Sequence, residues 1–305
     1  MPGWLAADVQ ADGVCIAHID HSGAGKPVIE YAGFFSKGAA SIPDLLARLA
    51  KELRLAQYQC TTLLAPVEYQ LLSVDAPNVP PEELKTAIRW RLKDLLDFHV
   101  DDATIDVLNV PFDKSSLRTH SMYAVAARNQ IIEQKQRLFV DAKIPLRVID
   151  IPEMAQRNIA ALLETDGRGI AFLSFDESGG LLTVSYTKEL YMARRIDISL
   201  SHLQRQNEEM QALHERVTLE VQRSLDHFDR QYHFIPLSTL VILPVGENTE
   251  ALRASLAAGL NVSVETFDME AAFDMSKVPA LKTQEAQQRY FFTLGAALRH
   301  EEKTL

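Results

Sequence analysis

The chain repeats one pattern of strands and turns in its two halves. In the first half, strand-like segments at residues 5–10, 13–20 and 28–36 are separated by short turns and followed by a helix. In the second half, residues 170–199 show a strand, a tight turn, a second strand, a short turn and a third strand, again before a helix. This duplication predicts an α/β protein of two lobes with a cleft between them.

Composition narrows the class of protein. A length of 305 residues suits two domains of about 150 residues each. The net charge of −10 excludes the basic surface that nucleic-acid binding requires. The two cysteines, Cys15 and Cys60, lie in apolar runs without metal-ligand spacing, which predicts buried, reduced thiols in a cytosolic protein.

Targeting signals are not evident in the sequence. The first ten residues lack a basic segment, and the longest stretch without Asp, Glu, Lys or Arg, from Gln231 to Gly246, contains two prolines. It falls short of the roughly 18–20 apolar residues that span a bilayer. We expect a cytoplasmic protein without direct membrane insertion.

Helical periodicity and proline positions suggest the domain limits. The first lobe is predicted at 1–165 and the second at 166–305. A helix–strand–strand–helix–strand block at about 82–152 reads as a small α/β module inserted into the first lobe. Its first helix carries an apolar stripe, with Trp90 on the opposite side. The stripe consists of Leu84, Ile88, Leu92 and Leu95.

Four segments resemble a known family. Residues 68–111 look like the signature region of the MshI proteins, which act in biogenesis of the mannose-sensitive haemagglutinin (MSHA) type IV pilus. These proteins are related to PilM and more distantly to the cytoplasmic part of GspL. The likeness continues at 121–155, 217–244 and 290–299 in the same order, and so covers nearly the whole chain.

The resemblance implies an actin-like, ribonuclease H-like duplicated fold with a nucleotide cleft. It also implies a cytoplasmic scaffold, peripheral to the inner membrane, that binds the short cytoplasmic tail of a PilN-like membrane protein. Through that partner the scaffold would connect, directly or indirectly, to the motor ATPase of pilus assembly.

In such proteins two strand–turn–strand loops bind the phosphates, and glycine allows their amides to approach closely. The first loop maps onto residues 8–15. Asp8 and Gly13 are present, but Gln10 stands at a glycine position and Cys15 at a lysine position. The alternative role of Asp8 and of Asp176 is to shape a β-turn.

The second loop has Ser174 at the carboxylate position and Asp176 at the glycine position, followed by Gly179 and Gly180. The adenosine motif retains one glycine, Gly246. With all three motifs altered, we expect no ATPase activity and no catalytic or metal-binding residues. ATP with Mg²⁺ is the one cofactor candidate.

A partner surface is suggested by Trp90 with its neighbours Arg89 and Arg91, because Trp and Arg are enriched in binding hot spots. The alternative is that Trp90 covers the strands of its own module. Three other functions stay open: a nucleotide-switched form of the same machine, a sugar-kinase-type enzyme, for which no catalytic Asp is identifiable, and a GspL-like scaffold of type II secretion.

Overall fold

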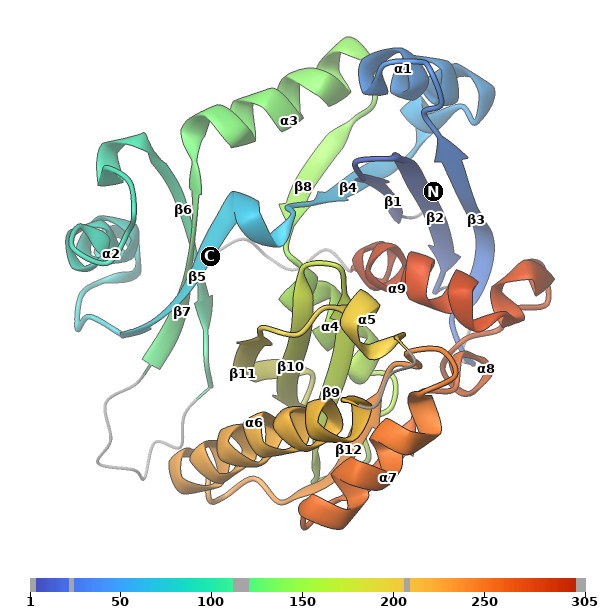
Figure 1. Cartoon of the computed structure of the whole chain (residues 1–305). Helices are drawn as coiled ribbons and strands as arrows, with labels where there is room; N and C mark the ends of the chain where they lie inside the picture. Colours follow the sequence, from blue (N-terminus) through green and yellow to red (C-terminus); the bar gives the residue numbers. More distant parts are fainter. Residues whose placement is uncertain (1–3, 22–24, 112–120, 206–208, 300–305) are drawn as a thin grey trace. The chain divides into compact units, whose positions relative to one another are not determined.

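The computed structural model describes residues 4–21, 25–111, 121–205 and 209–299 (Figure 1). The described residues pack into two units. The first contains residues 4–14 and the described part of 34–152, and the second contains those of 15–33 and 153–299. No helix in the described part of the chain has the length and apolar character needed to cross a bilayer.

Within the described residues, thirteen strands form three sheets. The strands are β1 (Trp4–Val9), β2 (Gly13–Asp20), β3 (Val28–Ser36), β4 (Gln59–Leu63), β5 (Tyr69–Asp75), β6 (Ala103–Asn109), β7 (Ser121–Arg128), β8 (Leu146–Asp150), β9 (Gly169–Asp176), β10 (Gly179–Tyr186), β11 (Glu189–Ile196), β12 (Leu237–Ile242) and β13 (Ser263–Thr266).

The α-helices are α1 (Ile42–Glu52), α2 (Leu84–Leu92), α3 (Asn129–Asp141), α4 (Pro152–Ala160), α5 (Leu200–Leu203), α6 (Met210–Gln231), α7 (Thr249–Gly259), α8 (Met269–Ala272) and α9 (Gln284–Ala297). The short 3₁₀ helices are Leu55–Gln57, Pro66–Glu68, Pro81–Glu83, Val100–Asp102 and Pro279–Lys282.

The two large sheets have the same topology. Their orders are β3-β2-β1-β4-β8 and β11-β10-β9-β12-β13, so each places its own strands in the order third, second, first, fourth, fifth. In both sheets the first strand pairs in parallel with the fourth, and the fourth with the fifth. The duplication predicted from the sequence is therefore confirmed.

The third sheet is small and antiparallel, with the order β5-β7-β6. Helix α2 covers one face, where Ile88 and Leu92 are buried against Val74, Val107 and Met122. Strand β5 belongs to this sheet, whereas the strand at 146–150, which the sequence pattern grouped with the module, pairs with β4 in the first large sheet. The apolar stripe also ends early, because α2 stops at Leu92 and Leu95 is 53% exposed.

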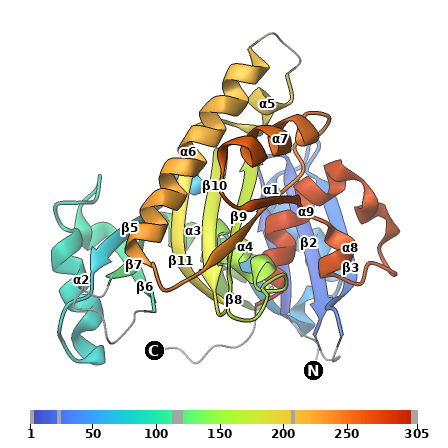
Figure 2. The ribbon, with the colours of Figure 1, turned by 90° about the horizontal axis from the view of Figure 1, so that it is seen from below.

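In the second unit, helices cover both faces of the sheet. Figure 2 shows α6 and α7 on one side of the sheet and α4 on the other. Helix α6 buries an apolar face that includes Val217, Val221, Leu225 and Phe228. An aromatic cluster joins β9 to its neighbours. Its three rings lie with centroids 5.2–5.8 Å apart and belong to Phe172 on β9, Phe267 after β13 and Phe291 on α9. This aromatic cluster fixes β9 and therefore the turn that follows it.

Candidate nucleotide and partner sites

The turn between β1 and β2 is closed by its own residues. The Gln10 side-chain amide donates to Oδ2 of Asp8 at 2.9 Å, and the Gln10 backbone N–H donates to the Gly13 carbonyl at 2.9 Å. A Cβ on Gly13 would lie 2.2 Å from the carbonyl oxygen of Phe35. Close packing of β3 thus accounts for this glycine without any ligand.

Ser174 lies in a buried hydrogen-bond network at the centre of β9. Its hydroxyl donates to Oε1 of Gln156 on α4 at 2.5 Å. The Gln156 amide nitrogen donates to Oγ1 of Thr183 at 2.9 Å and to two strand carbonyls, those of Phe172 and Leu181. Ser174 is therefore committed to joining α4 to the sheet. Its partner Gln156 could not be singled out from one sequence, because a lone glutamine in a helix carries no motif.

Asp176 ends β9 and caps the turn that follows. Its Oδ1 accepts the backbone N–H of Ser178 at 2.7 Å. Burial raises the pKa of Asp176, while the amides of Ser178 and Gly179 and the nearby Arg195 guanidinium act in the opposite direction. In a nucleotide-binding loop, backbone amides of this kind would face a phosphate. Here the Asp176 carboxylate accepts them instead.

The glycines of this hairpin also have a packing explanation. Gly179 has φ +131°, and a Cβ there would meet the Ile196 carbonyl oxygen at 2.8 Å. A Cβ on Gly180 would lie 2.7 Å from the Phe175 ring. Close approach of β11 and of an aromatic side chain requires both glycines.

Gly246 lies in a braced turn after β12. With φ +93° it takes a conformation that favours glycine. The Thr249 hydroxyl accepts the Val245 N–H at 2.9 Å and donates to the Gly246 carbonyl at 2.5 Å. The Gln288 side chain adds a bond to the Pro244 carbonyl.

The predicted residues fall into two groups. Asp8 and Gly13 lie in the β1–β2 hairpin, and Ser174, Asp176, Gly179 and Gly180 lie in the β9–β10 hairpin. The Leu243 N–H donates to the Leu173 carbonyl at 2.8 Å, which brings the turn containing Gly246 to the same sheet edge as the second hairpin.

An ion pair between a buried glutamate and an arginine at the surface was not foreseen. Arg195 on β11 donates from Nε and Nη2 to Oε1 of Glu153 at 3.1 and 2.6 Å. Glu153 is only 2% exposed. The pair joins β11 to the first turn of α4.

On the small module, the three predicted partner residues behave differently. Arg89 donates to the carbonyls of Ala103 and Val100 at 3.1 and 2.8 Å, so it ties α2 to the start of β6. Trp90 is 72% exposed, so it does not cover the strands of its own module. Arg91 is also exposed. Of the three predicted partner residues, Trp90 and Arg91 are therefore the two that are accessible to a partner.

Both cysteines are buried, as predicted, and neither is in a disulfide. Burial raises the pKa of Cys60 to about 12. Among the described residues no group of His, Cys, Asp or Glu side chains has an arrangement that could hold a metal ion.

These features define an α/β protein of the actin-like fold, with two mixed five-stranded sheets and a small antiparallel sheet, which confirms the predicted fold class. The chain is similar to one of a PilM–PilN type IV pilus biogenesis complex, with a TM-score of 0.70 and 19% identity over 96% of this chain and 97% of that chain.

Two more distant likenesses accompany it. One is to the cytoplasmic domain of EpsL, an inner-membrane component of the type II secretion system of Vibrio cholerae (TM-score 0.48, 15% identity, 80% of this chain and 83% of that chain). The other is to a Bacteroides thetaiotaomicron protein of actin-like ATPase fold (TM-score 0.47, 11% identity, 89% and 92%). No protein-family model and no curated protein matches the chain.

Proposed function

We propose that this protein is a PilM-like scaffold of a type IV pilus assembly platform, of the MSHA type that the MshI resemblance suggests. The observation that carries the proposal is the likeness to a chain of the PilM–PilN complex, which extends over 96% of this chain and includes the inserted sheet. The function is recognition of a partner, without bond chemistry.

The proposed ligand is the cytoplasmic tail of a PilN-like inner-membrane protein. An extended tail is bound by backbone pairing and a few apolar pockets. Trp90 and Arg91 are the module residues proposed to contact a partner, since an exposed tryptophan next to an arginine is typical of a hot spot. The motor ATPase is a second proposed partner, and the protein would lie in the cytoplasm, held at the inner membrane by its partner.

The nucleotide cleft is proposed to be degenerate. Gln10 binds Asp8 in one turn, and Asp176 binds an amide of its own turn in the other. A triphosphate would have to displace the Asp176 carboxylate and would meet Glu177 beside it, both at repulsive range. Two alternatives to this function are a nucleotide-switched machine of the same fold and a GspL-like scaffold of type II secretion.

The test is a binding titration with a synthetic tail peptide of the PilN-like partner. We expect saturable binding that Trp90→Ala weakens by roughly tenfold, a hot-spot loss of about 1.4 kcal/mol. Leu219→Ala is the matched control, because Leu219 is an exposed apolar residue on α6. Absence of binding to this tail, with binding to a type II secretion tail instead, would favour the GspL-like alternative.

A further inference from the structure

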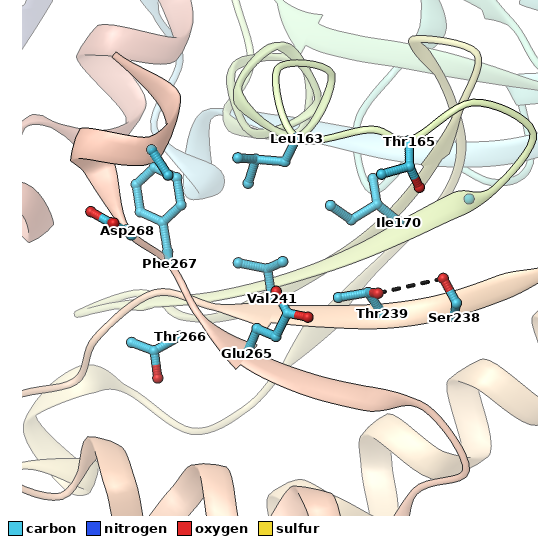
Figure 3. Close-up of a pocket in the computed structure, with 12 residues that line it drawn as sticks. Leu163, Thr165, Ile170, Ser238, Thr239, Val241, Glu265, Thr266, Phe267 and Asp268 are labelled. Atoms are coloured by element: carbon cyan, nitrogen blue, oxygen red, sulfur yellow. Dashed lines mark hydrogen bonds between the residues drawn. The ribbon is translucent and has the colours of Figure 1, made fainter. Parts of the chain in front are cut away.

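A groove opens on the face of the second sheet that carries α4 and α8. Its volume is about 240 Å³, and its floor is formed by Ile170 on β9, Val241 on β12 and Phe267 after β13. Figure 3 shows Leu163, Ile170 and Val241 converging on the same space. All three floor residues are buried, so the floor is a fixed apolar surface.

The groove is separate from the candidate nucleotide turns. Gly169 and Ile170 at the start of β9 line it, whereas Asp176 ends the same strand. At about 3.3 Å per residue, the strand separates the two ends by roughly 23 Å. A ligand that contacts Ile170 and Thr239, which are paired in register at this end of the groove, would lie away from the β9–β10 turn.

Two carboxylates border the apolar floor. Glu265 pairs with Val241 in register, so both side chains lie on the groove face, and Asp268 follows one residue after Phe267. Asp268 accepts the Glu270 N–H at 2.9 Å. Within the described part of the chain neither carboxylate forms an ion pair, and no Lys, Arg or His lines the groove.

Hydroxyl groups complete the polar border. Ser238 and Thr239 lie side by side with their oxygens 3.4 Å apart, and the Glu265 carboxylate points toward Thr239 in Figure 3. These oxygens can accept N–H donors. The volume corresponds to about eight waters at roughly 30 Å³ each, which suits one long side chain and is too small for a nucleotide.

We propose that the groove receives an arginine side chain of a partner protein. The aliphatic part of arginine packs on Ile170 and Val241, while the guanidinium donates to Glu265 and to the neighbouring hydroxyl oxygens. Arginine fits better than lysine, because its planar, weakly hydrated head offers several donors to oxygens spread around one border. The inference does not depend on the proposed pilus function.

The experiment uses the full chain with isotope-labelled isoleucine and valine methyl groups. The probe is the blocked tripeptide acetyl-Gly-Arg-Gly-amide, and its matched control is the same peptide with citrulline, which keeps the shape and removes the charge. We expect saturable shifts at Ile170 and Val241 with arginine, and about tenfold weaker binding with citrulline. Equal affinities for the two peptides would overturn the proposal.

Substitutions test whether peptide binding depends on the negative charge of Glu265. Glu265→Gln should weaken arginine binding by about tenfold, and Glu215→Gln, an exposed glutamate on α6, should leave it unchanged. Melting temperatures should show that both variants are folded. If spermidine displaces the peptide and binds more tightly, the groove is a small-amine site and the partner proposal is wrong.

Discussion

The two large sheets share one topology, yet their first turns are closed in different ways. In the β1–β2 turn the side chain of Gln10 reaches back to Asp8, whereas in the β9–β10 turn Asp176 reaches forward to the Ser178 amide. Gln10 and Asp176 stand at the positions where the resemblance places glycine. The two hairpins of one duplicated framework are thus closed by different internal contacts.

In the second sheet, polar side chains of α4 hold the strands. Gln156 bridges strands β9 and β10 from α4, and Glu153 binds Arg195 on β11. In the first sheet, the clearest close contact is the packing of Gly13 against the Phe35 carbonyl. The comparison predicts that the two halves respond to different substitutions.

Breaking the ion pair between Arg195 and the buried Glu153 should have the largest effect. Arg195→Met leaves the Glu153 carboxylate buried without its cation, which we expect to cost roughly 3 kcal/mol of unfolding free energy. Chemical denaturation measures this cost. Arg194→Met, one residue away and exposed, is the control and should change stability by less than about 0.5 kcal/mol. Equal effects of the two variants would show that the pair has no structural role.

The first sheet should be most sensitive at Gly13. Gly13→Ala forces a Cβ against the Phe35 carbonyl, so the backbone of β3 must shift, at a cost of about 2 kcal/mol. Gly25→Ala is the control, because no atom lies within 4 Å of the added Cβ. The difference in denaturation midpoint between the two variants tests whether packing alone requires the glycine.

Acid should destabilise the protein through buried histidines. Burial lowers the pKa of His214, and also that of His18, where Glu30 and Asp20 oppose the shift. The unfolded chain then binds more protons below about pH 6.5, so stability falls as the pH drops through that value.

His214→Leu should remove up to about 1.4 kcal/mol per pH unit from that slope between pH 6.5 and 5.5. Denaturation curves across this range measure the slope, with the exposed His227→Gln as control. A slope that His214→Leu leaves unchanged would mean that protonation of His214 does not couple to folding.

The smallest expected effect is the reaction of the two cysteine thiols with a labelling reagent in the native protein. Cys15 on β2 and Cys60 on β4 are buried, and burial raises the pKa of Cys60 to about 12. Neither should react with a thiol reagent at pH 8 until the protein unfolds. Rapid labelling of either one in the native protein would show that the first sheet opens locally.

The sequence was sufficient to predict that the two halves repeat one succession of strands, because alternating apolar runs and tight turns recur in both halves. It was also sufficient for α1, whose Ser41 cap accepts the Asp44 N–H at 3.2 Å. It could not assign residues 146–150 to the first large sheet, since strand pairing across the inserted module leaves no local pattern.

For the candidate site, the sequence identified the altered positions but not their new contacts. Gln10 and Asp176 were visible as departures from glycine, yet the atoms that they bind are fixed by turn geometry. Gln156 and Glu153 were overlooked because their partners lie 18 and 42 positions away in the chain. Contacts of that kind depend on packing and not on spacing.

We propose that the β1–β2 and β9–β10 turns of this scaffold are closed by their own side chains, and that nucleotide therefore does not control partner binding. The most direct measurement is the affinity for the PilN-like tail peptide by isothermal titration calorimetry, with and without millimolar Mg·ATP. We predict binding in both conditions with dissociation constants that agree within about twofold, because a ligand without differential affinity shifts no equilibrium. A change of tenfold or more, lost in Asp8→Ala, would contradict the account and establish a nucleotide switch.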